Sequence, residues 1–441
     1  MLRLCCSGDE DRIGFDEDVG SVGSLMTEKR CLPVIAGLAR GLIRPALAFA
    51  IAWPLTVSAL APAAFANEFI ASSGRIIGDE GRARLVLDFD KEPDFEVHYL
   101  NSPPRIVIDL PDVDYQFDPE ALVARGLFSD VRFGAMSQGR SRVVLTAKKP
   151  VAVASANVIA DGAAGNYRFV LDAEVTTPAL FDELMAKQDW SSVSSITTAS
   201  VSTATALPQT SQFVVAVDAG HGGIDSGAQG TKSGIAEKVI TLDYARQLAE
   251  SINQKPGMKA VLTRDSDVFL SLSERVALAR QQGVSLFISV HADNLKQKSI
   301  RGATVYTLSD KASDRMAQAL AERENKSDQL AGVTVMDSQP EVADILIDLT
   351  RRETQAFSVT LADRIIKAFE GKVALINNPH RYAGFQVLRA HDVPSVLLEL
   401  GFLSNSEDEK LLLDPEWRKK SADLLAEAIT TYKSQALADI H

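Results

Sequence analysis

Short runs of alternating apolar and polar residues fill the chain from about residue 68 to residue 175. They are rich in β-branched residues and are separated by Gly, Pro, Asn and Asp, the residues that turns between strands require. The clearest runs are Arg84–Asp90, Arg105–Leu110, Ser141–Thr146 and Tyr167–Asp172. About a hundred residues of this pattern predict a small all-β sandwich domain, for which we expect the bounds 67–176.

The segment 177–212 interrupts this rhythm. Its part from Ser191 to Gln212 consists mainly of Ser, Thr and Ala and has no apolar period, so it cannot bury enough surface to order itself. We therefore expect a flexible linker, preceded by a short helix over Phe181–Trp190 that closes the β domain.

Beyond residue 212, apolar strands alternate with helical patterns. The near-continuous apolar run Phe213–Asp218 is typical of a parallel strand covered on both faces, and an amphipathic helix begins at Glu237. Further strands are expected at Lys259–Thr263, Ser285–Val290, Gly302–Leu308 and Ser395–Leu400, with a helix at Leu272–Gln282. This alternation predicts an α/β domain over residues 213–435, with an open, mostly parallel sheet and helices on both faces. Ligands of such sheets lie beyond the carboxyl ends of the strands.

An insertion of residues 310–352 separates the strand ending at Leu308 from a helix expected to begin near Glu353. Helical patterns cover Ser313–Lys326 and Glu341–Leu349 within it. A simple crossover rarely needs such a length, and long insertions in compact domains are often lids. The alternative is that the second helix simply packs on the sheet.

The first 66 residues have the order of a secretory signal. Basic residues between Lys29 and Arg44 precede an uncharged run, and Ala64-Phe65-Ala66 offers a cleavage site. Cleavage near Ala66 predicts a periplasmic protein without a membrane span, and an uncleaved anchor is the alternative. The acidic stretch before Met26 does not suit the start of a signal, so Met26 competes with Met1 as the start of translation.

The net charge and the positions of the cysteines restrict the candidate partners and metal ligands. A formal net charge of -12 over 441 residues makes nucleic acid a poor candidate partner. All three cysteines precede residue 66, so the mature chain has neither a disulfide framework nor a thiolate metal site. Any bound metal must be held by His, Asp or Glu.

Three polar residues fall where ligands of an α/β sheet are expected. His221 and His291 each follow a predicted strand, and Glu237 begins the helix after a Gly-rich loop. Taken singly, each has an ordinary interpretation as a loop histidine or as a carboxylate that complements a helix dipole. Together they form the two-histidine, one-carboxylate set that is typical of catalytic zinc sites, which keep a fourth position for water.

Glu399 interrupts the apolar strand Ser395–Leu400. A carboxylate inside such a strand is costly unless it is paired or points into a site. It is therefore the candidate base for hydrolysis at a zinc site, and a core glutamate bound to a structural arginine is the alternative.

The α/β part resembles the N-acetylmuramoyl-L-alanine amidases of the zinc-dependent cell-division type from about Val214 to Tyr432. The resemblance is carried by Val217-Asp-Ala-Gly-His-Gly-Gly223, Asp225-x-Gly227, Glu237-Lys238, Ser289-Val-His-Ala-Asp293, Glu324-Asn325 and Pro394-x-Val-Leu-Leu-Glu-Leu-Gly-Phe-Leu-Ser-Asn405. It implies zinc ligands at His221, Glu237 and His291 and a catalytic glutamate at Glu399. The implied reaction cleaves the amide between the lactyl group of N-acetylmuramic acid and L-alanine in peptidoglycan, in cell-wall remodelling and daughter-cell separation.

The resemblance extends to the other segments. The β-rich part looks like the family's companion AMIN domain, with Arg105–Leu110 the most similar stretch. The insertion is similar to one that lies over the zinc in related amidases until a protein activator lifts it, and Glu324 is then the acidic residue expected to fill the open metal position.

Rival interpretations are a non-catalytic peptidoglycan-binding scaffold and a zinc peptidase that acts on the stem peptide. Three arginines, Arg264, Arg381 and Arg389, are further candidates to bind stem-peptide carboxylates, because the guanidinium group binds carboxylates through two hydrogen bonds. Each of them has the alternative of being a structural or surface charge.

Overall fold

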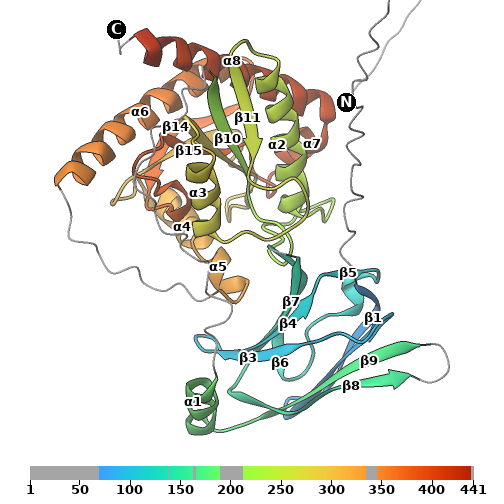
Figure 1. The fold of residues 1–441 in the computed structure, drawn as a ribbon. Coiled ribbons are helices and arrows are strands. Elements are labelled where there is room, and N and C mark those ends of the chain that lie inside the picture. The colour runs from blue at the N-terminus through green and yellow to red at the C-terminus, as the bar shows by residue number, and fades with distance from the viewer. Residues whose placement is uncertain (1–68, 138, 162–164, 189–211, 334–344, 439–441) are drawn as a thin grey trace, which may run out of the picture. The chain divides into compact units, whose positions relative to one another are not determined.

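The computed structural model describes residues 69–137, 139–161, 165–188, 212–333 and 345–438 (Figure 1). The predicted signal segment, nearly all of the predicted linker and the first part of the helix expected over Glu341–Leu349 lie outside the described residues.

The β-rich part consists of two sheets. A five-stranded sheet has the order β5-β1-β2-β9-β8, and a four-stranded sheet has the order β3-β4-β7-β6. The strands are β1 (Phe69–Gly78), β2 (Arg82–Phe89), β3 (Glu96–Leu100), β4 (Arg105–Pro111), β5 (Val113–Tyr115), β6 (Phe128–Met136), β7 (Arg140–Ala147), β8 (Val151–Asp161) and β9 (Asn166–Val175), with a short 3-10 helix η1 (Pro119–Ala121). The four strands expected most clearly from the sequence correspond to β2, β4, β7 and β9, and a shared apolar core joins the two sheets.

The helix expected at the end of this part is α1 (Pro178–Lys187). It begins earlier than the apolar pattern indicated, because the Thr177 side chain accepts a hydrogen bond from the Leu180 N–H and Pro178 suits the first helical turn. Phe181 is buried in the core of the β domain, so the helix covers one end of that core.

The α/β part contains one six-stranded sheet with the order β11-β10-β12-β15-β13-β14. Its strands are β10 (Phe213–Ala219), β11 (Met258–Leu262), β12 (Leu286–His291), β13 (Ala303–Leu308), β14 (Leu375–Ala383) and β15 (Ser395–Glu399). The first four strands of that order run parallel, whereas β13 pairs antiparallel with β15 and β14 pairs parallel with β13. The predicted open, mostly parallel sheet is confirmed. The β14 strand was not predicted, since its half-exposed sequence lacks a continuous apolar run.

Side chains on successive residues of the central strands enter two different cores, as the pleat requires. Val215 and Val217 of β10 pack with α2 (Glu237–Asn253), α6 (Ile345–Phe369) and α8 (Pro415–Ala438), whereas Ala216 packs on the opposite face. That second face is covered by α3 (Leu272–Gln281), α4 (Arg315–Glu324) and the short 3-10 helix η3 (Gln386–Leu388). Helices therefore lie on both faces, and α7 (Ser406–Leu413) follows the last strand.

The insertion forms α4, a single turn α5 (Ser327–Leu330) and the beginning of α6. The helix expected over Ser313–Lys326 corresponds to α4. The expectation of a separate helix starting near Glu353 was wrong, because α6 is continuous from Ile345 and no Gly or Pro lies between these two residues to end it.

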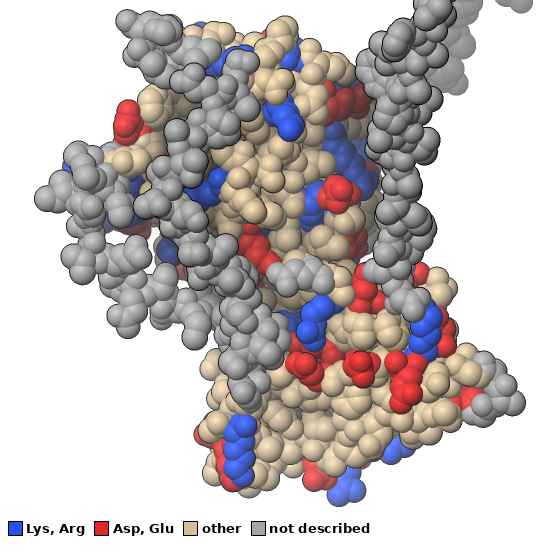
Figure 2. Space-filling model, viewed as in Figure 1, with Lys and Arg blue, Asp and Glu red and all other residues tan. Residues whose placement is uncertain are grey.

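Acidic and basic side chains are interspersed over the described residues on the face shown in Figure 2. Among the helices of the described residues, none is long and apolar enough to span a membrane.

Candidate active site

The polar residues singled out in the sequence meet at one edge of the sheet. His291 and Glu399 are the last residues of β12 and β15, and they lie opposite each other in the parallel pairing of these strands. His221 follows β10, the other parallel neighbour of β12. Glu237 is the first residue of α2 and is completely buried. His221, His291 and Glu399 therefore lie at the carboxyl ends of adjacent strands, and Glu237 lies next to both histidines at the start of α2.

Two imidazole nitrogens converge on Glu237. His221 Nε2 lies 3.2 Å from Glu237 Oε2, and His291 Nδ1 lies 3.3 Å from Glu237 Oε1. Although these distances are short, neither nitrogen makes a hydrogen bond with any described residue, and both are buried. Buried polar atoms are normally paired, so two such nitrogens facing a carboxylate fit a cation between them.

Asp225 fixes the orientation of the first histidine. Its Oδ2 lies 2.9 Å from His221 Nδ1, and its Oδ1 accepts a hydrogen bond from the Gly227 N–H. A proton on Nδ1 leaves Nε2 with its lone pair directed into the site, which is the usual role of a carboxylate behind a metal-binding histidine. The sequence assigned no role to Asp225. It appeared there only as part of the motif Asp225-x-Gly227, four residues after His221.

The charges of the carboxylates in the site favour a bound cation or proton. Burial alone would lower the pKa of His221, but Glu237, Asp225 and Glu324 outweigh it and hold this pKa well above the ordinary value. Burial likewise disfavours ionised Glu237, yet the two histidines hold the pKa of that carboxyl well below its usual range. In the metal-free protein, protonation of His221 is thus favoured by these carboxylates.

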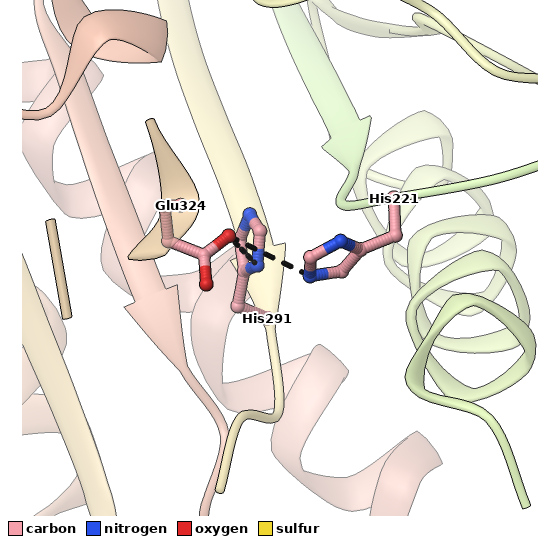
Figure 3. Close-up of side chains that lie close together, drawn as sticks. All are labelled: His221, His291 and Glu324. Atoms are coloured by element: carbon pink, nitrogen blue, oxygen red, sulfur yellow. Dashed lines mark ion pairs between the residues drawn. The ribbon is translucent and has the colours of Figure 1, made fainter. Parts of the chain in front are cut away.

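Glu324 of α4 enters the same cluster from the insertion, as the resemblance implies. Its Oε2 lies 3.5 Å from His221 Nε2 and 3.2 Å from His291 Nδ1. Figure 3 shows the carboxylate pointing at the two imidazole rings. Ligand atoms of His221, His291 and Glu324 lie within 4.8 Å of one another, close enough to bind one metal ion together.

Residues beside Glu324 attach the insertion to the loops around the site, and no pattern in the sequence indicated these contacts. Arg323 pairs with Asp293, which lies two residues beyond His291. The Asn325 carboxamide donates to Gly384 O and accepts from the Gln386 N–H, both at 2.8 Å. Ser327 donates to Asp225 Oδ2, the oxygen that also faces His221. The insertion therefore contacts both a histidine pair and the carboxylate behind one of them.

Glu399 is completely buried and has one carboxylate oxygen without a hydrogen bond. Its Oε2 accepts from the Asp293 N–H at 3.0 Å, whereas Oε1 has no partner among the described residues. Burial raises the pKa of Glu399 well above its usual range, and the carboxylates of Asp293, Glu237 and Glu324 raise it further. Such surroundings favour the protonated carboxyl, and the oxygen without a partner is available for proton transfer.

A strand-edge cluster of two histidines and carboxylates, with a buried glutamate of raised pKa beside it, is typical of metal-dependent hydrolases. Comparison with known proteins gives the family. Residues 215–431 match the family model Amidase_3, described as N-acetylmuramoyl-L-alanine amidase, and residues 75–171 match the AMIN domain.

Two relatives from Escherichia coli agree with these matches. The N-acetylmuramoyl-L-alanine amidase AmiA of Escherichia coli K12 is 40% identical over 220 residues, which are 50% of this chain and 75% of that protein. AmiC of Escherichia coli O6:H1 is 31% identical over 402 residues, covering 86% of this chain and 93% of that protein. Among solved structures, the catalytic domain of CwlV from Bacillus (Paenibacillus) polymyxa var. colistinus covers 51% of this chain and 99% of its own, with 28% identity and a TM-score of 0.37. The chain belongs to the N-acetylmuramoyl-L-alanine amidase family and carries an AMIN domain.

The burial of Glu399 generates a prediction about the stability of the metal-free protein. In the unfolded chain this carboxyl ionises near its ordinary pKa, whereas in the folded protein its pKa is raised, so the free energy of unfolding falls as pH rises between the two values. Glu399→Gln removes this cost and keeps an acceptor for the Asp293 N–H. We expect the Tm of the metal-free protein at pH 7.5 to rise by about 3 °C or more, the shift that ~1 kcal/mol gives a domain of this size.

The control is Glu322→Gln, which changes an exposed carboxyl of α4 and leaves the Tm unchanged. A Tm of Glu399→Gln equal to that of the parent at pH 7.5, or a gain as large at pH 4 as at pH 7.5, would contradict the raised pKa.

Proposed function

We propose that this protein is a zinc hydrolase that cleaves the amide bond between N-acetylmuramic acid and L-alanine in peptidoglycan. The observation that carries the proposal is the pair of buried, unbonded nitrogens of His221 and His291, which face Glu237 next to the free oxygen of Glu399. The family membership supports the substrate, and the geometry supports the chemistry.

His221, Glu237 and His291 are the proposed zinc ligands. Two neutral imidazoles and one carboxylate suit Zn²⁺, and a set of three protein ligands leaves the fourth position that catalysis requires. When bound there, zinc would polarise the scissile carbonyl and lower the pKa of a water molecule. Asp225 holds the ring of His221 in the tautomer that presents Nε2 to the metal.

Glu399 is the proposed general base and acid. Its Oε1 accepts the proton of the attacking water, and the same oxygen then delivers that proton to the departing nitrogen of L-alanine. Two features suit the carboxyl to both steps: its unbonded oxygen and a pKa raised above the ordinary range of a glutamate. The Asp293 N–H, bonded to the other oxygen, holds the carboxyl in a fixed orientation.

The insertion is the proposed autoinhibitory element. Glu324 Oε2 lies within 3.5 Å of both histidine nitrogens and would occupy the position needed by water and substrate. The contacts of Arg323, Asn325 and Ser327 hold the helix in this place. Activity then requires a protein activator that displaces the insertion.

The proposal extends to the place in the cell where the protein acts. A signal segment cleaved near Ala66 would deliver the enzyme to the periplasm, where peptidoglycan is accessible. The AMIN domain is proposed to direct the enzyme to envelope or wall components. The biological roles would be cell-wall remodelling and the separation of daughter cells.

Two substitutions separate the roles of ligand and base. His221→Ala removes a ligand, so both bound zinc and hydrolysis should be lost. Glu399→Gln keeps the ligands, so zinc should remain bound while turnover falls by roughly 10²–10⁴-fold, the usual contribution of general acid–base catalysis. Metal content is measured by elemental analysis of the purified protein, and turnover by release of stem peptides. Zinc-dependent turnover of Glu399→Gln close to that of the parent would exclude Glu399 as the base.

The autoinhibitory role of Glu324 predicts a gain of activity. Glu324→Gln removes the charge that competes for the metal, so hydrolysis without activator should rise by on the order of tenfold. A point substitution is preferable to deleting the insertion, since Ala317, Leu320 and Ala321 of α4 belong to the apolar core. The control is Glu322→Gln, an exposed residue of the same helix, with unchanged activity. If both variants hydrolyse at the parent's rate, Glu324 does not restrain the enzyme.

A further inference from the structure

Three successive carbonyl groups at the end of β10 point to two buried arginines. The carbonyls of Ala219, Gly220 and His221 all accept hydrogen bonds from the guanidinium groups of Arg264 or Arg275. In a regular strand, successive carbonyls point alternately to opposite sides. The arginines therefore hold the chain in a turn at the place where it delivers His221 to the site.

Arg275 of α3 joins this turn to the strand before it. Its Nη1 donates to Ala219 O at 2.7 Å and to Asp218 Oδ1 at 2.8 Å, and its Nη2 donates to His221 O at 2.8 Å. Asp218 is completely buried, and Ser289 and Thr263 also donate to its carboxylate. Burial disfavours its charged form, but Arg275 and these hydroxyls still hold the pKa of Asp218 below its ordinary value.

Arg264, which lies two residues after β11, makes hydrogen bonds to the same turn. Its Nε donates to Ala219 O, and its Nη2 donates to Gly220 O and Lys238 O, each at 2.9 Å. It is 3% exposed, and burial lowers the pKa of its guanidinium to about 10. Its donors are occupied by backbone oxygens at the base of the site. The possibility raised from the sequence, that Arg264 binds a stem-peptide carboxylate, is therefore not supported.

The turn is strained and tightly enclosed. His221 has φ 61°, in the left-handed region that residues with a side chain avoid at a cost of about 1–3 kcal/mol. Such a conformation persists only when its surroundings determine it several times over, which the arginine hydrogen bonds do here. At Gly220 an added Cβ would lie 2.5 Å from the His291 ring, so the backbone of one histidine's loop passes directly against the other histidine.

We propose that Arg264 and Arg275 are positioning residues for the metal site, which hold the strained turn so that His221 Nε2 faces His291 and Glu237 in advance of metal binding. Neither arginine contacts the ligand atoms, and both act through the backbone of His221 and its neighbours. This proposal rests on the proposed function insofar as the bound ion is zinc. It adds that metal affinity is set partly by two guanidinium groups behind the ligands.

The test uses lysine substitutions in the full chain. Arg264→Lys and Arg275→Lys keep the positive charge but lose the planar group that bridges several carbonyls. The matched control is Arg418→Lys: Arg418 is 9% exposed and its Nη1 also donates to a backbone carbonyl, that of Leu412, but it lies in α8. Zinc affinity is measured by competition with a chelator. Hydrogen exchange of residues 216–224 is measured in the metal-free protein.

We expect either substitution at the turn to speed exchange of these amides and to weaken zinc binding by roughly 10- to 100-fold, the range found when groups behind metal ligands are removed. Arg418→Lys should lower the Tm without changing zinc affinity or exchange at the turn. Equal zinc affinity in the parent and both turn variants would overturn the proposal, as would unchanged exchange of residues 216–224.

The two proposals fail differently in this experiment. If Arg275→Lys does not fold, zinc affinity and hydrogen exchange of Arg264→Lys decide whether the proposal stands. That variant keeps Arg275, the ion-pair partner of Asp218. If the parent itself binds no zinc, the proposed function fails, and exchange at the turn still shows whether the arginines hold His221. If Arg418→Lys loses as much zinc affinity as the two turn variants, Arg264 and Arg275 only stabilise the fold in general and do not position the metal site.

Discussion

The parallel pairing of β10 with β12 and of β12 with β15 is the constraint on which the site depends. It brings the carboxyl ends of three strands to one edge of the sheet, and His221, His291 and Glu399 follow or end those strands. Apolar side chains on both faces of these strands bury the sheet between helices. The apolar core therefore fixes the separation of groups that are far apart in the sequence.

The same edge concentrates buried charge that the apolar core cannot compensate. His221, Glu237, His291 and Glu399 are all buried, and three of their polar atoms lack a hydrogen bond among the described residues. Such an arrangement is unfavourable for folding unless a bound ion of matching charge offsets its energetic cost. This set of donors fits a divalent cation. The carboxylate of Glu324 lies close to the same two histidine nitrogens. The catalytic and inhibitory roles proposed for the cluster thus follow from one electrostatic arrangement.

Much of this arrangement was predictable from the sequence, because histidines after apolar strands and a glutamate within one are local signals. The α/β order, the parallel strands and the convergence of His221, Glu237, His291 and Glu399 followed from them. The antiparallel direction of β13 and the strand β14 could not be predicted in this way, because the pairing of strands depends on packing between distant segments. The contacts of Asp225 with His221 and Ser327, and the arginines behind the turn, depend on backbone conformations such as φ 61° at His221, which no periodic pattern indicates.

Mass spectrometry of the products from purified peptidoglycan tests the central claim most directly. The full chain carrying Glu324→Gln is incubated with the polymer, with chelator and with chelator followed by excess zinc. The account predicts free stem peptides that begin with L-alanine, absent with chelator and restored by zinc. Shortened peptides still attached to N-acetylmuramic acid would make the protein a peptidase, and polymer that is bound but uncut would make it a wall-binding scaffold. Either result would contradict the account.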